Sequence, residues 1–149
     1  MRIMGLDHGA HTVGVSLSDE LFLTAQPAEI IRRERESAIR GTLQRIETLV
    51  KERGVCRIVV GLPLNMDGSE TERAEAARRF GEKLQRRLEI PVEFADERLT
   101  TVRAKELLEE MRIGWKDEKE YIDMMAANVI LQEYLDNHRE TLRKEYGTV

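Results

Sequence analysis

Three acidic residues, Asp7, Glu97 and Asp123, occupy positions where the neighbouring sequence is apolar or where a predicted strand ends. An acid at the end of a buried strand costs free energy unless another group pairs with it. Three carboxylates that converged would repel one another strongly, so we expect a divalent cation between them. Carboxylate oxygens favour Mg²⁺ or Mn²⁺ over zinc, and such a cation could activate water for hydrolysis.

Asp7 ends an apolar run, Ile3–Leu6, and glycines stand near it at positions 5, 9 and 14. The pattern predicts a strand, a tight turn and an antiparallel partner strand that begins near Val13. Because glycine has no side chain, a bulky ligand or a metal with its waters could approach the backbone closely here.

Asp123 is the only charged residue between Tyr121 and Gln132. In a helix it shares a face with Ala126, Ala127 and Ile130, and this apolar face would pack on a sheet. The small alanines would allow a close approach. A second interpretation stays open, in which an acid near a helix N-terminus interacts favourably with the helix dipole and bonds a nearby amide.

Glu97 follows a predicted strand in the parallel part of the sheet, where the carboxyl ends of strands form the sites of α/β proteins. If the strands that end at Asp7 and Glu97 are neighbours and the last helix crosses that end, all three carboxylates converge. A zinc site is not predicted, because the histidines lack ligand spacing on one element and Cys56 is the single cysteine. His8 and His11 are predicted to be turn residues.

The elements that would position these acids follow a simple order: three strands, a helix, a strand, a helix, a strand and two helices. This order predicts an α/β fold, in which a mixed five-stranded sheet combines a three-strand antiparallel meander with two parallel strands and is flanked by helices. Strands are expected at 3–7, 13–18, within 21–31, at 57–63 and at 91–97. Helices are expected up to residue 53 with a charged, solvated entry at 32–37, from a capping box at 69–72, after residue 100 and from about 118 to about 137.

A chain of 149 residues suits one domain with a full core, predicted over 1–138 and followed by a charged tail over 139–149. Its net charge of −4 excludes a polycation that binds nucleic acid through its overall charge. Cys56 cannot form an internal disulfide and is predicted to be a small core residue. No signal peptide or membrane-spanning stretch stands out, so we expect a cytoplasmic protein without a membrane partner.

Six segments resemble the YqgF family and follow its order over nearly the whole chain. This family comprises bacterial RNase H-like proteins, also called Holliday-junction-resolvase-like, and is associated with maturation of the 5′ end of pre-16S ribosomal RNA. The resemblance implies an RNase H-like fold and a nuclease whose acidic residues are Asp7, Glu97 and Asp123. The segments are 5–9, 13–19, 25–27, 59–69, 96–101 and 123–135.

Two features depart from the family pattern. The family usually has an arginine between its first two glycine motifs, whereas this chain has Thr12 there, preceded by His11. If that arginine contacts substrate phosphate, this protein binds its substrate differently. Val59–Leu62 carries no acid where many RNase H-like nucleases have one, so the resemblance implies that Glu97 replaces it. Two further acids are candidate accessory ligands: Asp67 and Asp96.

Four residues are candidate contacts to nucleic acid: Arg98, Arg32, Arg33 and Trp115. Arg98 could meet a substrate phosphate or pair with its acidic neighbours. Trp115 could stack on a base or act as a packing anchor. Most of the other arginines are expected to be solvated.

The leading hypothesis is metal-dependent phosphodiester hydrolysis of precursor rRNA, free or within a pre-ribosomal particle, by a monomer or a homodimer. One alternative is a resolvase that cuts branched DNA symmetrically as a dimer. Another is an RNA-binding ribosome-assembly or transcription factor with a nuclease-like fold that does not cut. Actin-like and sugar-kinase ATPases share the strand–Asp–x–Gly hairpin, but they hold the nucleotide between two domains and this chain predicts one.

Overall fold

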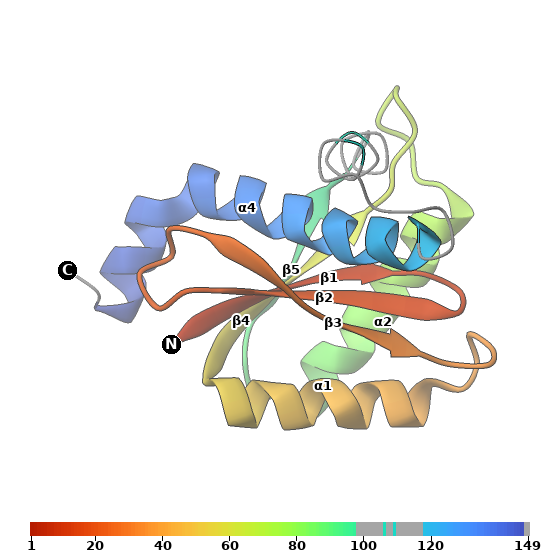
Figure 1. The fold of residues 1–149 in the computed structure, drawn as a ribbon, viewed down its shortest axis with the longest axis horizontal. Coiled ribbons are helices and arrows are strands. Elements are labelled where there is room, and N and C mark those ends of the chain that lie inside the picture. The colour runs from red at the N-terminus through yellow and green to blue at the C-terminus, as the bar shows by residue number, and fades with distance from the viewer. Residues whose placement is uncertain (98–105, 107–108, 110–117, 148–149) are drawn as a thin grey trace.

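The computed structural model describes residues 1–97, 106, 109 and 118–147 (Figure 1). Its strands are β1 (Arg2–His8), β2 (Thr12–Ser18), β3 (Ala25–Arg32), β4 (Val55–Leu62) and β5 (Val92–Asp96). They form one sheet in the order β3-β2-β1-β4-β5. The β1–β2 and β2–β3 pairs are antiparallel, and the β1–β4 and β4–β5 pairs are parallel. The predicted α/β fold, with a meander and two parallel strands, is confirmed.

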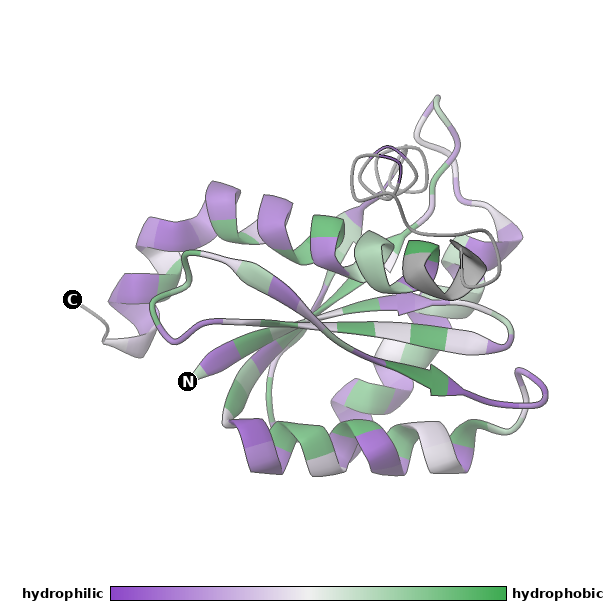
Figure 2. Cartoon of the chain, viewed as in Figure 1, coloured by the Kyte–Doolittle hydropathy of each residue, from purple (hydrophilic) through white to green (hydrophobic). Residues whose placement is uncertain are grey.

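Helices cover both faces of the sheet. α1 (Ile39–Arg53) and α2 (Glu72–Arg87) pack on one face, and α4 (Glu118–Tyr146) crosses the other (Figure 1). Successive strand residues face opposite helical layers, so Leu6 and Val60 belong to the core beside α1 and α2, whereas Ile3 and Val59 belong to the core beneath α4. In α4, apolar residues concentrate over the sheet and the C-terminal turns are hydrophilic (Figure 2).

The ends of α1 and α2 have identifiable caps. Gly54 ends α1 in the left-handed conformation with φ of 64°, which confirms the predicted glycine stop. α2 begins one residue after Thr71, whose hydroxyl accepts a hydrogen bond from the Ala74 N–H. The predicted capping box at Ser69 is therefore wrong, since the Ser69 hydroxyl donates to Asp67 Oδ1 at 2.6 Å within the preceding loop.

The C-terminal segment contradicts the expected helix end near Asn137, because α4 continues to Tyr146. Two contacts hold these last turns on the sheet. Leu142 is buried in the core beneath α4. Arg57, a buried residue of β4, forms ion pairs with Glu93 and Glu145, and its Nε donates to the Tyr146 hydroxyl at 3.2 Å. Glu145, one of the charged residues that suggested a solvated tail, is therefore a partner of the buried Arg57.

In the part of the chain that the structure describes, α4 and the other helices offer no apolar stretch long enough to cross a membrane.

Candidate active site

Asp7 lies near the carboxyl end of β1, on the face that α4 covers. Because side chains alternate along a strand, Asp7 lies on the same side of β1 as Ile3 and Gly5. Its antiparallel partner on β2 is Gly14. His8, the next residue, faces the opposite helical layer and stacks on Phe80 of α2 with ring centroids 4.6 Å apart. The expectation that His8 is a turn residue is wrong, because it is the last residue of the strand.

Glycines on β1 and β2 allow α4 to approach the strands closely enough to bring Asp123 beside Asp7. A Cβ atom at Gly14 would overlap the backbone carbonyl of Asp123, and it would lie 2.8 Å from that residue's carbonyl carbon. A Cβ at Gly5 would lie 2.7 Å from the Leu131 Cβ. The sequence predicted a close approach of the helix to the sheet. At the site this approach is a contact between the backbones of Gly14 and Asp123.

The two carboxylates influence each other electrostatically. Burial, reinforced by the charge of Asp123 and opposed by the charge of Arg73, raises the pKa of Asp7 from 3.8 to about 7. Among the described residues, none donates a hydrogen bond to the Asp7 carboxylate. A cation beside this pair would remove the repulsion and provide the missing positive partner.

Thr12 fixes the orientation of the Asp123 carboxylate. Its hydroxyl donates a 2.5 Å hydrogen bond to Asp123 Oδ2 across the β2–α4 interface. Thr12 lies two residues from Gly14 on β2, so it faces α4 as Asp7 does. The position where the family has an arginine is thus occupied here by a direct partner of one of the acids. The contact was not predicted. The alternation of residues along the second strand could have indicated it, because Thr12 lies on the same side as Gly14, the residue that pairs with Asp7.

Glu97 reaches the same face of the sheet by a route that the sequence did not reveal. β5 is not a neighbour of β1, because β4 lies between them, so the assumed pairing of their strands is wrong. Gly61 of β4 leaves the space open, since a Cβ there would lie 2.8 Å from the Glu97 Cγ. The buried Glu97 side chain therefore lies against Gly61 of β4, while its N–H donates to the Leu62 carbonyl at 2.9 Å.

The described residues do not assemble three ligands around one point. No three histidine, cysteine, aspartate or glutamate side chains in that part of the chain lie close enough to hold a metal jointly. Asp7 and Asp123 are brought together, and Glu97 shares their face of the sheet without joining them in one cluster. This arrangement fits Mg²⁺, which binds through one or two carboxylates and keeps water or substrate oxygens in its remaining positions.

Arg33 occupies a different place from the one predicted. It is buried, and its guanidinium donates to the backbone carbonyls of Gly9 at 2.6 Å and Ala10 at 3.2 Å. Of these two candidate contacts to nucleic acid, Arg32 is exposed on β3, whereas Arg33 is buried and bonds to the hairpin that follows Asp7.

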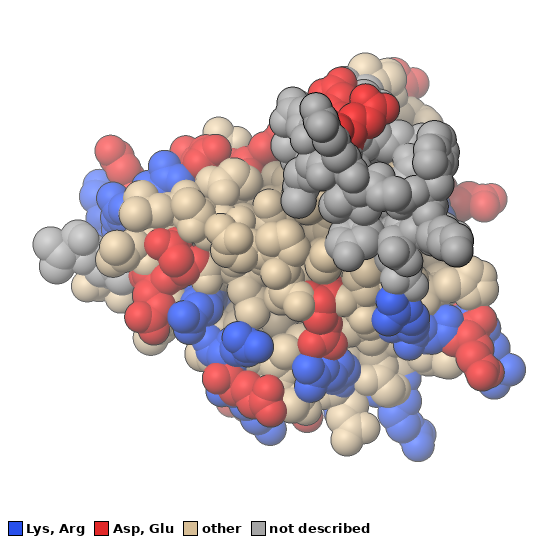
Figure 3. All heavy atoms as spheres, in the orientation of Figure 1, with Lys and Arg blue, Asp and Glu red and all other residues tan. Residues whose placement is uncertain are grey.

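Two further candidate acids, Asp67 and Asp96, lie in a loop and at a strand end. Asp67 organises its own loop by accepting hydrogen bonds from the Ser69 N–H and hydroxyl. Asp96 is exposed at the end of β5. Arg98 and Trp115 lie outside the described residues. On the face seen in Figure 3, the described acidic and basic side chains are interspersed around an uncharged centre and form no continuous basic stripe.

Replacing Thr12 tests the orienting hydrogen bond. Thr12→Val keeps the shape of the side chain and removes the donor, so any metal-dependent activity should fall roughly 10- to 100-fold, the usual effect of losing a group that orients a ligand. Thr12→Ser retains the hydroxyl and should stay within a few-fold of wild type. Equal losses in the two variants, measured at saturating Mg²⁺, would assign the effect to packing instead.

Comparisons with known proteins identify the family of the chain. A family model described as "RuvX: Holliday junction resolvase" matches residues 1–137. A protein of Agathobacter rectalis named "Putative pre-16S rRNA nuclease" is 51% identical over 136 residues, which are 91% of this chain and 95% of the relative. A protein of the same name from Limosilactobacillus fermentum is 48% identical over 145 residues, covering 97% of this chain and 99% of the relative.

A solved structure has the same fold. Thermus thermophilus RuvC in complex with a Holliday junction substrate matches with a TM-score of 0.60 at 14% identity, over 95% of this chain and 97% of that chain. At this identity the likeness concerns the fold alone. It agrees with the RNase H-like architecture that the motifs implied.

Proposed function

Because the chain belongs to the RuvX Holliday junction resolvase family, we propose that it is a nuclease that hydrolyses phosphodiester bonds with the help of Mg²⁺ or Mn²⁺. Its relatives' name, pre-16S rRNA nuclease, supports precursor 16S rRNA as the substrate, cut in the cytoplasm during ribosome maturation. The observation that carries the proposal is the Asp7–Asp123 pair, two acids forced together on a face of the sheet that glycines keep open.

In this mechanism Asp7 and Asp123 would hold the cation, and Glu97 is the third acid on the same face. A bound divalent ion supplies Lewis-acid activation of water and stabilises the leaving oxygen. Asp7 must lose its proton to serve as a ligand, and its pKa of about 7 means that this loss occurs near neutral pH. Thr12 keeps the Asp123 carboxylate aimed by its 2.5 Å hydrogen bond, so less ordering is required when the substrate binds.

A second candidate substrate is branched DNA, which the family's description as a Holliday junction resolvase favours. A resolvase must cut two strands at symmetric positions, so this activity would require a dimer with two acidic sites. A monomer acting on RNA would need one site. The assembled pre-ribosomal particle is the third substrate to test, because a scaffold could present the RNA strand to a single domain.

The proposal is tested by cleavage of end-labelled precursor rRNA, with four-way DNA in parallel, in Mg²⁺, Mn²⁺ or EDTA. We expect the wild type to cut only with metal, and Asp123→Asn to lose at least about a hundredfold in rate because a charged metal ligand is gone. Asp136→Asn is the matched control, since Asp136 is an exposed residue of the same helix that pairs with Arg139 at the surface.

The outcomes separate the candidates. Cutting of RNA but not DNA supports rRNA processing, and paired symmetric cuts in four-way DNA support the resolvase. If neither nucleic acid nor pre-ribosomal particles are cut, while RNA still binds to Asp123→Asn in EDTA, the nuclease proposal is contradicted and a binding function replaces it.

A further inference from the structure

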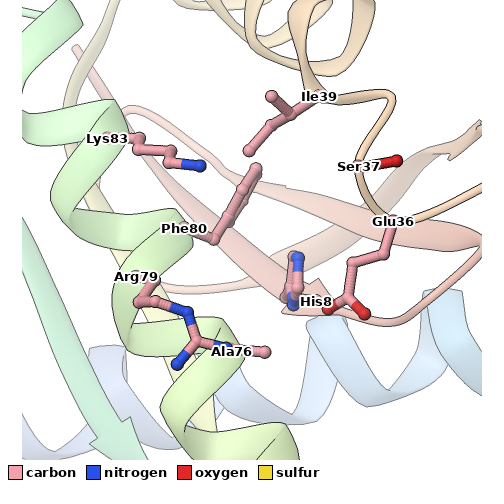
Figure 4. Close-up of a pocket in the computed structure, with 8 residues that line it drawn as sticks. All are labelled: His8, Glu36, Ser37, Ile39, Ala76, Arg79, Phe80 and Lys83. Atoms are coloured by element: carbon pink, nitrogen blue, oxygen red, sulfur yellow. The ribbon is translucent and has the colours of Figure 1, made fainter.

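A pocket of about 350 Å³ lies on the face of the sheet opposite the acids. Arg79, Phe80 and Lys83 of α2 line one side, Glu36 and Ser37 of the segment before α1 line the other, and His8 lies between them (Figure 4). His8 directly follows Asp7 on β1, so the pocket and the acidic site are on the two sides of the same strand end.

His8, which lines the pocket, lies between two arginines that are not themselves lining residues, Arg33 and Arg73. Both ring nitrogens of His8 face guanidinium groups: Nε2 is 2.8 Å from Arg33 Nη2, and Nδ1 is 3.1 Å from Arg73 Nη2. A neutral imidazole accepts at one nitrogen only, and a protonated imidazole accepts at neither. The ring can therefore accept from only one of the two guanidiniums, and each Nη2 also donates to a backbone carbonyl: Arg33 to Gly9 at 2.6 Å and Arg73 to His8 at 3.2 Å.

One donor of the arginine next to His8 is unmatched. Arg33 is buried with 8% of its surface exposed, and its Nη1 is buried with no hydrogen-bond partner among the described residues. Leaving a buried charged donor unmatched costs free energy. Arg33 also lies over the Phe80 ring that lines the pocket, with its guanidinium carbon 6.0 Å from the ring centroid.

The charges around the pocket are also unbalanced. Glu36, its one lining acid, is ion-paired with Arg73 at 2.9 Å, so its charge is already matched. Arg79 and Lys83 stand one helical turn apart on α2 and form no ion pair with any residue in the described ranges. Two positive groups of the pocket, Arg79 and Lys83, are therefore without an ion-pair partner among the described residues, whereas Arg33 interacts electrostatically with Glu36.

We propose that this pocket binds a phosphate group of the nucleic-acid strand. A phosphate carries only acceptors and negative charge, which complements the excess of donors and of positive charge. A free phosphate ion has the same chemistry. The choice of a strand rests on the proposed function, because His8 follows Asp7 on β1 and lines the pocket, so the pocket adjoins the strand end that carries the acid.

The test measures binding of a fluorescein-labelled single-stranded RNA of about twelve nucleotides by anisotropy, in EDTA so that cleavage plays no part. Arg79→Gln/Lys83→Gln removes the two exposed cations and leaves the buried His8 unchanged. Arg86→Gln/Lys51→Gln is the matched control, because it removes the same charge from exposed positions that do not line the pocket. A titration with inorganic phosphate at constant ionic strength forms the second arm.

We expect Arg79→Gln/Lys83→Gln to weaken RNA binding roughly tenfold and to lower the slope of log affinity against log salt by about one, while the control keeps the wild-type slope. Equal effects of the two double variants would overturn the proposal. It would also be overturned if inorganic phosphate bound in the pocket while RNA affinity was the same in the pocket variant and wild type, since the ligand would then be the free ion.

The binding and cleavage experiments test the pocket proposal and the nuclease proposal separately. RNA binding that depends on Arg79 and Lys83, without cleavage under any metal, contradicts the nuclease proposal and supports the pocket. Cleavage that requires Asp7, with RNA binding unaffected by Arg79→Gln/Lys83→Gln, supports the nuclease and overturns the pocket.

Discussion

Asp7→Asn is expected to abolish metal-dependent cleavage and, at the same time, to make the metal-free protein more stable. The loss of activity should be at least about 10²- to 10³-fold, because a neutral amide replaces a charged ligand of the cation. The gain in stability follows from the cost of keeping an ionised carboxylate in this position beside Asp123. A residue needed only for folding would change stability in the opposite direction.

The pH dependence of the stability has a definite sign. The pKa of Asp7 is about 7 in the folded protein against 3.8 as its ordinary value, so the folded state binds the proton more tightly. The free energy of unfolding of the metal-free wild type should therefore fall as pH rises from about 4 to about 7, and stay reduced above that range. The total is on the order of 4 kcal/mol at most, and Asp7→Asn should lack this decrease.

Urea unfolding in EDTA at pH 5 and pH 8 measures the stability gained by Asp7→Asn and its dependence on pH. At pH 8 we expect Asp7→Asn to unfold at a higher urea concentration than wild type, and at pH 5 the difference should shrink. Added Mg²⁺ should stabilise the wild type more at pH 8 than at pH 6, because the cation binds the ionised carboxylate. A wild type as stable as Asp7→Asn at pH 8 in EDTA would contradict the assigned electrostatic cost.

Gly14→Ala should damage the fold and the site together. Its new Cβ would overlap the backbone carbonyl of Asp123, and a backbone atom can yield only if α4 moves away from β2. We expect a loss of about 3 kcal/mol in the free energy of unfolding, at the upper end of the usual cost of overpacking. In the fraction that stays folded, a displaced Asp123 should lower the cleavage rate roughly a hundredfold, because misplacements near 1 Å have effects of that size.

Gly41→Ala is the matched control for this substitution. Gly41 lies within α1, and a Cβ there would meet no atom within 4 Å. The same change should therefore stabilise the protein by about 0.5–1 kcal/mol, since alanine is favoured over glycine inside a helix. Thermal unfolding and single-turnover cleavage of both variants make the comparison. A Gly14→Ala variant with wild-type stability would refute the close packing of α4 on β2.

The fold was predictable because its signals are local. Alternation at Val13–Ser18, the apolar run before Asp7 and the glycine stop at Gly54 each depend on a few neighbouring residues. Predictions failed where a distant partner decided the outcome. The last helix continues past Asn137 because its final turns are held by the Arg57–Glu145 ion pair and by Leu142, which is buried in the core. Arg33 looked like a surface charge until the hairpin carbonyls appeared around it.

The sequence by itself determined the candidate acids, their strand and helix, and the glycines that leave space beside them. The tertiary structure decided which acids meet. Asp7 and Asp123 are neighbours because Gly14 allows a backbone contact, whereas Glu97 lies against Gly61 of β4, the strand between β1 and β5. Strand order and the seating of α4 depend on contacts between residues far apart in the chain. Local spacing carries no information about those distances, so only the folded structure could supply them.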